Sequence, residues 1–468
     1  MLNQPSHSLV AEPGTLRPML RLALPVLLEK LLHLLVGMVD TWLAGRYLED
    51  AHLAAIGLIA FVLWLLPCLF ATVSVGTLAL VARSTGAGDR ETAQRVLHQS
   101  LLLGAGLAIV AFALALIGRQ AFATAMQLQA EAAPLAARYL LLLAPAIPCI
   151  MLQQIGGTAL RAAGDTFSPF LILGVVNLVN AALSTVLVIG VGPFPAWGWE
   201  GLAISTLIGH LIGGALMLLL LVRGRAGLHL EWKRLVFDWP TARRILRVGL
   251  PGGGDMLAIV LCHLWFLSIV NRLGTTEAAA HSLGIRIESL AFLPGAAFQT
   301  AAAALTGQYL GAGDRRGAAR AVLLALAVGG SLMTWAGVFF YFAARPLAAF
   351  FLGDEHPRTL DLCAQLLQIV SFAMPALAVS MILSGALGGA GDTRFPLLFT
   401  FLGFLGVRIP LAYWLAWETI PLPLLDIALP GWGFGVIGAW LAMVIDLSFR
   451  ALLVLLRFRH GGWSRLEI

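Results

Sequence analysis

Long apolar stretches separated by short polar segments run along the whole chain. Each stretch is about 20–30 residues long, and about 20 apolar residues in a helix cross the hydrocarbon layer of a membrane. We predict transmembrane helices at residues 19–45, 52–82, 92–117, 134–160, 168–190, 199–222, 245–272, 278–308, 317–343, 359–388, 395–416 and 433–456. The predicted fold class is an all-α polytopic membrane protein with twelve transmembrane helices.

Several short sequence motifs occur twice along the chain. Three short motifs return in the same order, at 21–25 and 247–251, at 86–90 and 311–315, and at 163–166 and 390–393. Nearly constant spacing indicates an internal duplication. We predict two six-helix lobes related by this repeat, an amino-terminal lobe at 1–222 and a carboxy-terminal lobe at 245–468, joined by a basic cytoplasmic linker at 223–244. Duplicated helical halves are typical of transporters, with the site between them.

Composition and charge support a membrane location. The chain is 59% hydrophobic and 12% charged, whereas a soluble domain carries about 25% charged residues. With the amino terminus inside, 21 of the 30 Lys and Arg residues lie on the cytoplasmic side and six lie outside. This bias predicts that both termini are cytoplasmic. The basic linker suits anionic lipid rather than nucleic acid.

Enzyme and metal-site patterns are missing from the sequence. The four cysteines are far apart, without a CxxC pair, and lie in or near apolar helices, at Cys68, Cys149, Cys262 and Cys363. We expect buried thiols rather than disulfides or metal ligands. HExxH and GxSxG motifs are also absent. We therefore expect no enzymatic activity, no bound metal and no cofactor.

The repeated GAGD motifs have a functional and a structural interpretation. GxGD is the signature of intramembrane aspartyl proteases, but no Tyr-Asp partner motif occurs in this chain. A phosphate loop would need a following Lys and a preceding strand. We favour tight turns in which Gly ends one helix and Asp89 or Asp314 caps the next, and we expect the same at Asp165 and Asp392.

The first predicted helix carries the clearest functional candidates. Glu29, His33, Gly37 and Asp40 fall on one helical face. Charged residues inside a membrane are costly and usually line a cavity or an ion path. For Glu29 and its neighbour Lys30 we favour an interhelical pair, whereas for Asp40 we favour function.

Polar residues in the fifth and sixth helices complete this candidate site. Asn177 and Asn180 share a helical face with Ser184 one turn further, and Thr206 lies in the next helix. Such residues can hold helices together. They can also line a cavity and hydrogen-bond a titrating carboxylate.

The carboxy-terminal half does not copy this chemistry. Asp255 occupies the position of Glu29, but Phe266 stands where the repeat would place Asp40, and Glu288 is a further acid in the eighth helix. The secondary ion-coupling candidates are therefore Glu29, His33, Ser184, Asp255 and Glu288. We also expect a structural ion pair in this half, joining Arg286 or Arg408 to Glu288 or Asp446.

The chain resembles the multidrug and toxic compound extrusion (MATE) transporters, most closely their DinF-like branch. The resemblance spans essentially the whole chain. Its motifs are VDTWLAG at 39–45 followed by LAAIG at 53–57, the repeated GAGD turns, and RIPLAY at 408–413.

This resemblance implies twelve helices in two lobes and export of organic, often cationic or aromatic, compounds in exchange for protons or sodium ions. The ion-coupling residues of the amino-terminal lobe carry over to Asp40, Asn177, Asn180 and Thr206. Many relatives have an aspartate where this chain has Ser184. Because sodium prefers several oxygen ligands, the missing acid favours H+ over Na+ as the coupling ion.

The predicted function is therefore an ion-coupled antiporter that works by alternating access. We expect it to act as a monomer in the bacterial inner membrane, with small organic substrates and membrane lipid as its partners. One alternative is a flippase for lipid-linked oligosaccharides or lipids, although few Lys or Arg residues lie inside the helices. The other is a polytopic membrane enzyme such as a GxGD-type protease.

Overall fold

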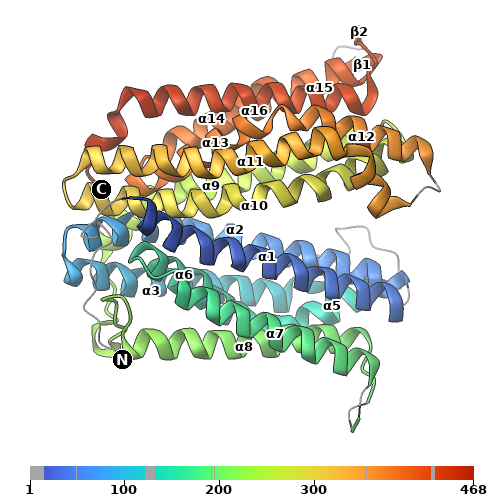
Figure 1. Ribbon diagram of the computed structural model, residues 1–468. Helices are drawn as coiled ribbons and strands as arrows, with labels where there is room; N and C mark the ends of the chain where they lie inside the picture. Colours follow the sequence, from blue (N-terminus) through green and yellow to red (C-terminus); the bar gives the residue numbers. More distant parts are fainter. Residues whose placement is uncertain are drawn as a thin grey trace. The chain divides into compact units, whose positions relative to one another are not determined.

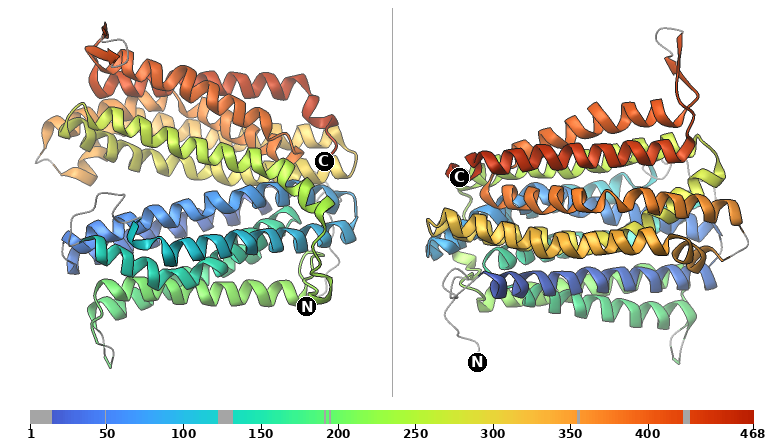
Figure 2. Two further views of the ribbon diagram at one scale, coloured as in Figure 1. Left: turned by 180° about the vertical axis from the view of Figure 1, so that it is seen from behind. Right: turned by 45° about the horizontal axis from the view of Figure 1, so that its top comes forward.

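The computed structural model describes residues 15–48, 50–121, 132–190, 192–193, 195–353, 356–422 and 427–468. Long helices account for most of the described chain (Figures 1 and 2). Those of the first half are α1 Leu16–Tyr47, α2 Asp50–Gly86, α3 Arg90–Ile117, α5 Ala132–Leu143, α6 Ile147–Ala162, α7 Phe167–Ile189 and α8 Trp199–Arg223. Those of the second half are α9 Trp239–Asn271, α10 Thr275–Gly311, α11 Arg315–Leu352, α12 Pro357–Ser371, α13 Met374–Ala390, α14 Arg394–Gly403, α15 Ile409–Ala416 and α16 Gly435–His460.

Short elements join or extend these helices. The 3-10 turns are η2 Ala144–Ala146, η3 Trp232–Arg234 and η5 Gly462–Arg465, and η4 Phe404–Arg408 is a π-helical turn. Within the described ranges, 11 helical segments are long and apolar enough to cross a membrane, and α12 with α13, bent by 54°, makes twelve if the pair is one span. The predicted all-α polytopic fold is confirmed.

A small hairpin near the carboxyl end was not predicted from the sequence. Strands β1 Thr419–Leu422 and β2 Ile427–Pro430 pair antiparallel, with Thr419 opposite Pro430. The apolar pattern of this segment is too short for a membrane helix, and its residues alone do not indicate pairing. The hairpin lengthens the connection between α15 and α16.

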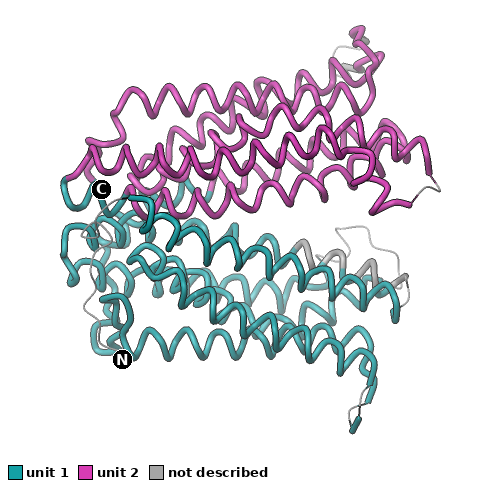
Figure 3. Tube along the Cα trace, viewed as in Figure 1, with its two compact units in different colours: residues 1–253, 307–313, 468 teal, residues 254–306, 314–467 magenta. Residues whose placement is uncertain are grey.

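The chain forms two compact units, each with its own hydrophobic core (Figure 3). Unit 1 comprises residues 1–253 with 307–313 and 468, and unit 2 comprises 254–306 and 314–467. In unit 1, α7 packs against α1 and α8, while α2 packs against α3, α5 and α6. In unit 2, α13 packs against α11 and α16, and α11 also packs against α12.

Glycines explain why the first part of α9 belongs to unit 1. A Cβ on Gly253 would lie 2.8 Å from Thr72 Cα, and a Cβ on Gly249 would collide with the Thr72 carbonyl. Small residues let backbones approach closely inside a membrane. The predicted lobe boundaries at 222 and 245 mark the sequence repeat, and they stay a prediction.

The repeated GAGD motifs form the expected tight turns. Gly88 and Gly313 have φ of 73° and 76°, the left-handed region that glycine adopts without strain. Asp89 Oδ1 accepts from the Thr92 backbone N–H at 2.9 Å, and in the second repeat Asp314 Oδ1 accepts from the Gly317 backbone N–H at 2.7 Å. Both aspartates are helix caps, as predicted.

The second pair of repeated aspartates does more than cap. Asp165 accepts from the Ser168 backbone N–H at 2.9 Å and also pairs with Arg225. Asp392 pairs with Arg457, with Oδ2 and Nη2 2.8 Å apart. In each unit, therefore, an ion pair ties this turn to a basic residue after or near the end of the last long helix.

Candidate ion-coupling site

The polar centre of unit 1 is formed by three helices, α1, α7 and α8. With its amide oriented to satisfy both neighbours, Asn180 donates from Nδ2 to Asp40 Oδ2 at 3.3 Å and accepts from Thr206 Oγ1 at 3.1 Å. Ser184 lies one turn along α7 beside Asp40, and its Oγ is 2.6 Å from Ser205 Oγ. The structure brings together the predicted residues Asp40, Asn180, Thr206 and Ser184.

Asp40 has no cationic partner within the described part of the chain. Its neighbours are neutral amides and hydroxyls, and its Oδ1 is buried without a hydrogen-bond partner. Asn177, one turn before Asn180 on α7, is also buried, and its Nδ2 has no partner. A buried charge without a partner is costly, so a proton or an added cation would stabilise this site.

Tyr139 of α5 is a site residue that sequence reasoning missed. It is buried, its ring stacks on Trp199 with centroids 6.1 Å apart, and its hydroxyl hydrogen-bonds Thr206 and faces the Asp40 charge. The signal that could have found it is a phenol in the middle of an apolar helix, since a buried Tyr O–H usually finds a partner.

Glu29, by contrast, is an ion-paired carboxylate. Both of its oxygens accept from Nη2 of Arg161 on α6, at 2.9 and 3.0 Å. Both side chains are largely buried. The structure thus gives Glu29 the interhelical partner that the sequence predicted without identifying it.

His33 lies on the same face of α1 and interacts electrostatically with His210 of α8 and with Lys30. Gln153 of α6 holds His210 at two points. Its Nε2 donates to the His210 carbonyl at 2.9 Å, and its Oε1 is 3.4 Å from Nδ1 of the ring. A second polar cluster of unit 1 therefore lies between the Asp40 site and the Glu29 pair.

The polar centre of unit 2 is saturated with ion pairs. Arg408 and Arg450 both bind Asp446, with nitrogen–oxygen distances of 2.8 to 3.0 Å. Asp446 is fully buried and Arg408 is 1% exposed. Of the pairings that the sequence left open, the structure shows Arg408 with Asp446, and Arg450 adds a second cation.

The two secondary candidates of unit 2 lie near this cluster. Glu288 interacts electrostatically with Arg408. Asp255 hydrogen-bonds Thr400 and interacts with Arg450, and its Oδ1 is buried without a hydrogen-bond partner. Each of these carboxylates therefore has an arginine nearby, whereas Asp40 has none within the described residues.

The π-helical turn η4 places Arg408 in this cluster. Phe404 begins the turn, and the Arg408 and Arg450 guanidinium carbons lie 4.4 and 4.6 Å from its ring centroid. Cation–π contact and the shared carboxylate together hold both guanidinium groups in a buried position. The sequence signal for this distortion was Pro410, which cannot donate the regular helical hydrogen bond.

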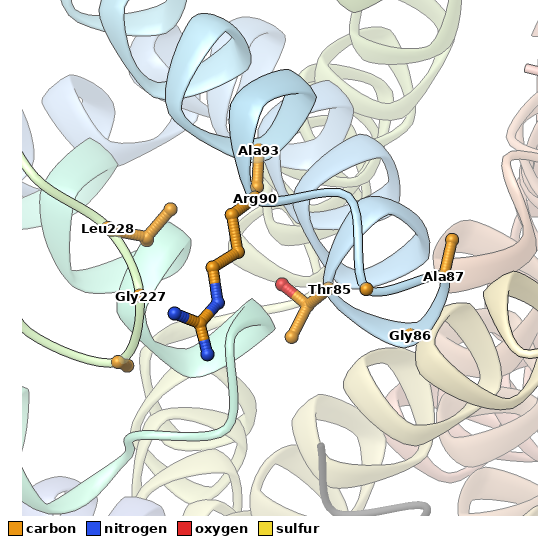
Figure 4. Close-up of a pocket in the computed structure, with 9 residues that line it drawn as sticks. Thr85, Gly86, Ala87, Arg90, Ala93, Gly227 and Leu228 are labelled. Atoms are coloured by element: carbon orange, nitrogen blue, oxygen red, sulfur yellow. The ribbon is translucent and has the colours of Figure 1, made fainter. Parts of the chain in front are cut away.

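A separate cavity of about 300 Å³ lies at the first GAGD turn (Figure 4). Thr85, Gly86, Gly88 and Arg90 line it together with Gly227 and its neighbours. Figure 4 shows the Arg90 side chain extending into the space between them. None of the ion-coupling candidates lines this cavity.

The described residues contain no group of side chains that could bind a metal ion. All four cysteines are free, and no three His, Cys, Asp or Glu side chains come together there in a metal-binding group.

Comparison with known proteins gives one consistent family. The MatE family model matches residues 25–186 and again 251–414, so the two matches begin at the repeated Pro25 and Pro251. A "Probable multidrug resistance protein NorM" of Thermotoga maritima is 26% identical over 97% of this chain and 94% of its own length. A protein of Shewanella oneidensis described as an FAD transporter is 26% identical over 87% of this chain and 89% of its own.

Solved structures share the fold. The outward-facing structure of a multidrug resistance MATE family transporter has a TM-score of 0.87, with 21% identity and full coverage of both chains. A transporter of the MOP superfamily from Pyrococcus furiosus also gives 0.87, at 22% identity and full coverage. The family match spans well over half of the chain and occurs once in each half. The chain therefore belongs to the MatE family of multi-pass membrane transporters and is not an enzyme.

Proposed function

We propose that this transporter exports small organic compounds, cationic or aromatic ones above all, in exchange for protons. Several relatives are described as multidrug resistance proteins. An aromatic cation suits a site that offers carboxylates and aromatic rings. The motifs at 39–45 and 408–413 favour the DinF-like branch of the family.

The observation that carries the coupling proposal is the chemical environment of Asp40. This carboxylate is surrounded by Asn180, Ser184, Thr206 and Tyr139, all neutral, and has one buried oxygen without a partner. Removal from water disfavours the charged form of a carboxylic acid. Asp40 is therefore the group that binds a proton when the site is closed and releases it when the site opens to water.

Protons rather than sodium ions are proposed because, among the described residues, one carboxylate contributes to the site. The resemblance described above implies an acid at the position of Ser184, whose hydroxyl is already bonded to Ser205. Sodium would need several strong oxygen ligands around one charge. Asn180 can hydrogen-bond either the protonated or the ionised Asp40, so the proton can come and go without rearrangement.

The proposed cycle is alternating access, with the two repeats as the moving lobes and both termini in the cytoplasm. The Lys and Arg bias supports this orientation in a bacterial inner membrane. Reporter fusions at positions 10, 232 and 466 should all read cytoplasmic, and an external reading at 232 would contradict the orientation. We propose a monomer as the working unit, because a single chain contains both repeats matched by the family model.

The test is transport by purified protein in liposomes, with ethidium as substrate and either a proton or a sodium gradient as driving force. Wild-type protein should respond to the proton gradient alone. Asp40→Asn should lose export while keeping its fold, and Asp89→Asn, which changes an exposed turn acid, should transport normally.

Three results would overturn parts of this proposal. Full proton-driven export by Asp40→Asn would exclude Asp40 as the coupling site and turn attention to Asp255 and Glu288. Strict dependence on sodium at fixed pH would reverse the choice of ion. Transport of only phosphate-bearing lipids would favour a flippase.

A further inference from the structure

We propose that His33 and His210 carry the proton between Asp40 and the Glu29 end of unit 1. This inference rests on the proposed proton coupling and assigns residues to its path. It starts from the second polar cluster of unit 1, which the coupling site itself does not use.

The positions of the two histidines along their helices fit such a path. His33 precedes Asp40 by seven residues of α1, which is about 10 Å at 1.5 Å per residue. His210 follows Thr206 by four residues of α8, about 6 Å along the axis. Because α7 packs against both helices and the two imidazoles interact electrostatically, both histidines lie on the Glu29 side of Asp40 and near enough to influence each other's charge.

Gln153 determines which nitrogen of His210 is available. The His210 carbonyl can only accept a hydrogen bond, so the amide nitrogen of Gln153 must face it, at 2.9 Å. The amide oxygen then faces Nδ1 of the ring at 3.4 Å. Nδ1 therefore carries a hydrogen in the neutral ring, and Nε2 is left with a free lone pair that can take up a proton.

Gly213 makes room for this arrangement. A Cβ at Gly213 would lie 3.0 Å from both Cδ and Nε2 of Gln153. The glycine, one turn beyond His210 on α8, thus lets the Gln153 side chain reach the ring. This is a positioning role rather than contact with the proton.

The charges around the two histidines favour passage over storage. On α1, His33 is flanked by Lys30 and Glu29, and α6 contributes Arg161, whose charge is taken up by Glu29. The α7 helix has no titratable side chain in its sequence. A proton on His33 is therefore repelled by Lys30. Because the His33 side chain is exposed rather than enclosed, we expect it to release the proton when its surroundings open to water.

The proton balance of the step is simple. The O–H bond of protonated Asp40 breaks, and the proton passes through the hydroxyls near Thr206 and water to Nε2 of His210. His210 then passes that proton on to His33, and His33 releases it to water. Asp40 ends as a carboxylate, both imidazoles end neutral, and no electrons are transferred.

The experiment compares His210→Ala and His33→Ala with wild type in liposomes, with ethidium export driven by a proton gradient. Each variant should export about tenfold more slowly, less than a positioned acid or base can contribute, because conformational steps also limit turnover. Added imidazole should restore much of the rate, and the KM for ethidium should not change. His263→Ala, in α9 of unit 2, is the matched control and should be neither slowed nor rescued.

A second pair of variants keeps the test decisive if an alanine variant fails to reach the membrane. His210→Gln and His33→Gln keep polar side chains but cannot carry a proton, so they should also be slow and should lose the wild-type pH profile. Wild-type rates and pH profiles in these variants, or slow rates that imidazole leaves unchanged in the alanine variants, would overturn the relay. If Asp40→Asn still exports in response to protons, the coupling proposal itself fails, which is a separate result.

Discussion

The two units contain equivalent frameworks but opposite electrostatics. In unit 1, the carboxylate of Asp40 has neutral neighbours and an oxygen without a partner. In unit 2, Asp446 binds two arginines at once and is fully buried. A buried carboxylate that is already paired with cations can stabilise the structure, whereas one without a cationic partner is available to bind a proton or another cation. The comparison teaches that duplication preserved the helices but not the charges around the carboxylates: Asp40 of unit 1 has neutral neighbours, whereas the acids described in unit 2 lie near arginines.

At the first carboxylate of each repeat the difference between the units is reversed: the acid of unit 1 is paired, and that of unit 2 has an oxygen without a partner. Glu29 is locked by Arg161, but the repeat places Gly388 where that arginine would be, so Asp255 has no such partner on α13. A Cβ on Gly388 would meet nothing within 4 Å. Each unit therefore contains one saturated carboxylate and one with an unpartnered oxygen, at different positions.

Glycine placement lets each unit accommodate its own chemistry. Gly201 packs on the end of α7 as Gly438 packs on the end of α15, which aligns α8 with α16. By that alignment Gly209 corresponds to Asp446. At this helix crossing, unit 1 has its glycine on α8 (Gly209, facing Val176), whereas unit 2 has it on α14 (Gly403, facing Asp446). The repeat spacing matches Gly403 to Val176.

The largest expected effect comes from breaking the saturated carboxylate. Asp446→Asn leaves Arg408 and Arg450 buried without a counter-charge, and losing one partner of a buried pair costs about 3–5 kcal/mol. The thermal unfolding midpoint of the purified protein should fall clearly. Asp40→Asn removes a charge that has no cationic partner, so its midpoint should stay at or above that of wild type.

A control separates charge from shape in this prediction. Replacing the whole cluster by apolar residues of similar volume, Asp446→Leu with Arg408→Met and Arg450→Met, should restore most of the lost stability, because no buried charge remains. Equal destabilisation by Asp446→Asn and Asp40→Asn would show that the two carboxylates do not differ as the comparison claims.

A smaller loss of stability is expected from adding a methyl group at the crossing glycine of each unit, Gly403 or Gly209. A Cβ at Gly403 would lie 2.5 Å from Arg450 Cγ and would collide with Asp446 Oδ1, whereas a Cβ at Gly209 would meet the Val176 carbonyl at 3.1 Å. Overpacking costs about 1–3 kcal/mol. Gly403→Ala should therefore lower the unfolding midpoint more than Gly209→Ala does. The opposite order would mean that the ion cluster shifts more easily than the α7–α8 crossing.

The sequence predicted the helices and the repeat because both leave long-range signals, hydrophobic length and motif spacing. It also predicted which face of α1 carries Asp40, because helical periodicity fixes the face. It did not identify Arg161, Tyr139 or Gln153 as partners, since a partner across a helix interface depends on packing and register rather than on spacing within one helix. The β1–β2 hairpin was missed because its local pattern resembles an ordinary apolar segment. The π-turn was missed because Pro410 marks a disturbed helix without indicating which kind of turn results.

The smallest effect should appear where the two halves are alike. Asp89 and Asp314 cap α3 and α11 in the same way, at 2.9 and 2.7 Å from a backbone N–H. Asp89→Ala and Asp314→Ala should each cost about 1 kcal/mol, as loss of a helix cap usually does. Measured unfolding midpoints should therefore drop slightly and by similar amounts, and Asp→Asn variants at both positions should keep the cap.

The pH dependence of the Asp89 cap adds an independent check. The hydroxyl and backbone N–H of Thr92 hold the pKa of Asp89 below its usual range. A carboxyl with a lowered pKa in the folded state contributes stability above its unfolded pKa and loses it as pH falls through the folded value. The difference between wild type and Asp89→Ala should therefore persist at neutral pH and shrink only in strong acid. A difference that vanished near pH 6 would instead point to a titrating role for this turn, and the two halves would then differ even here.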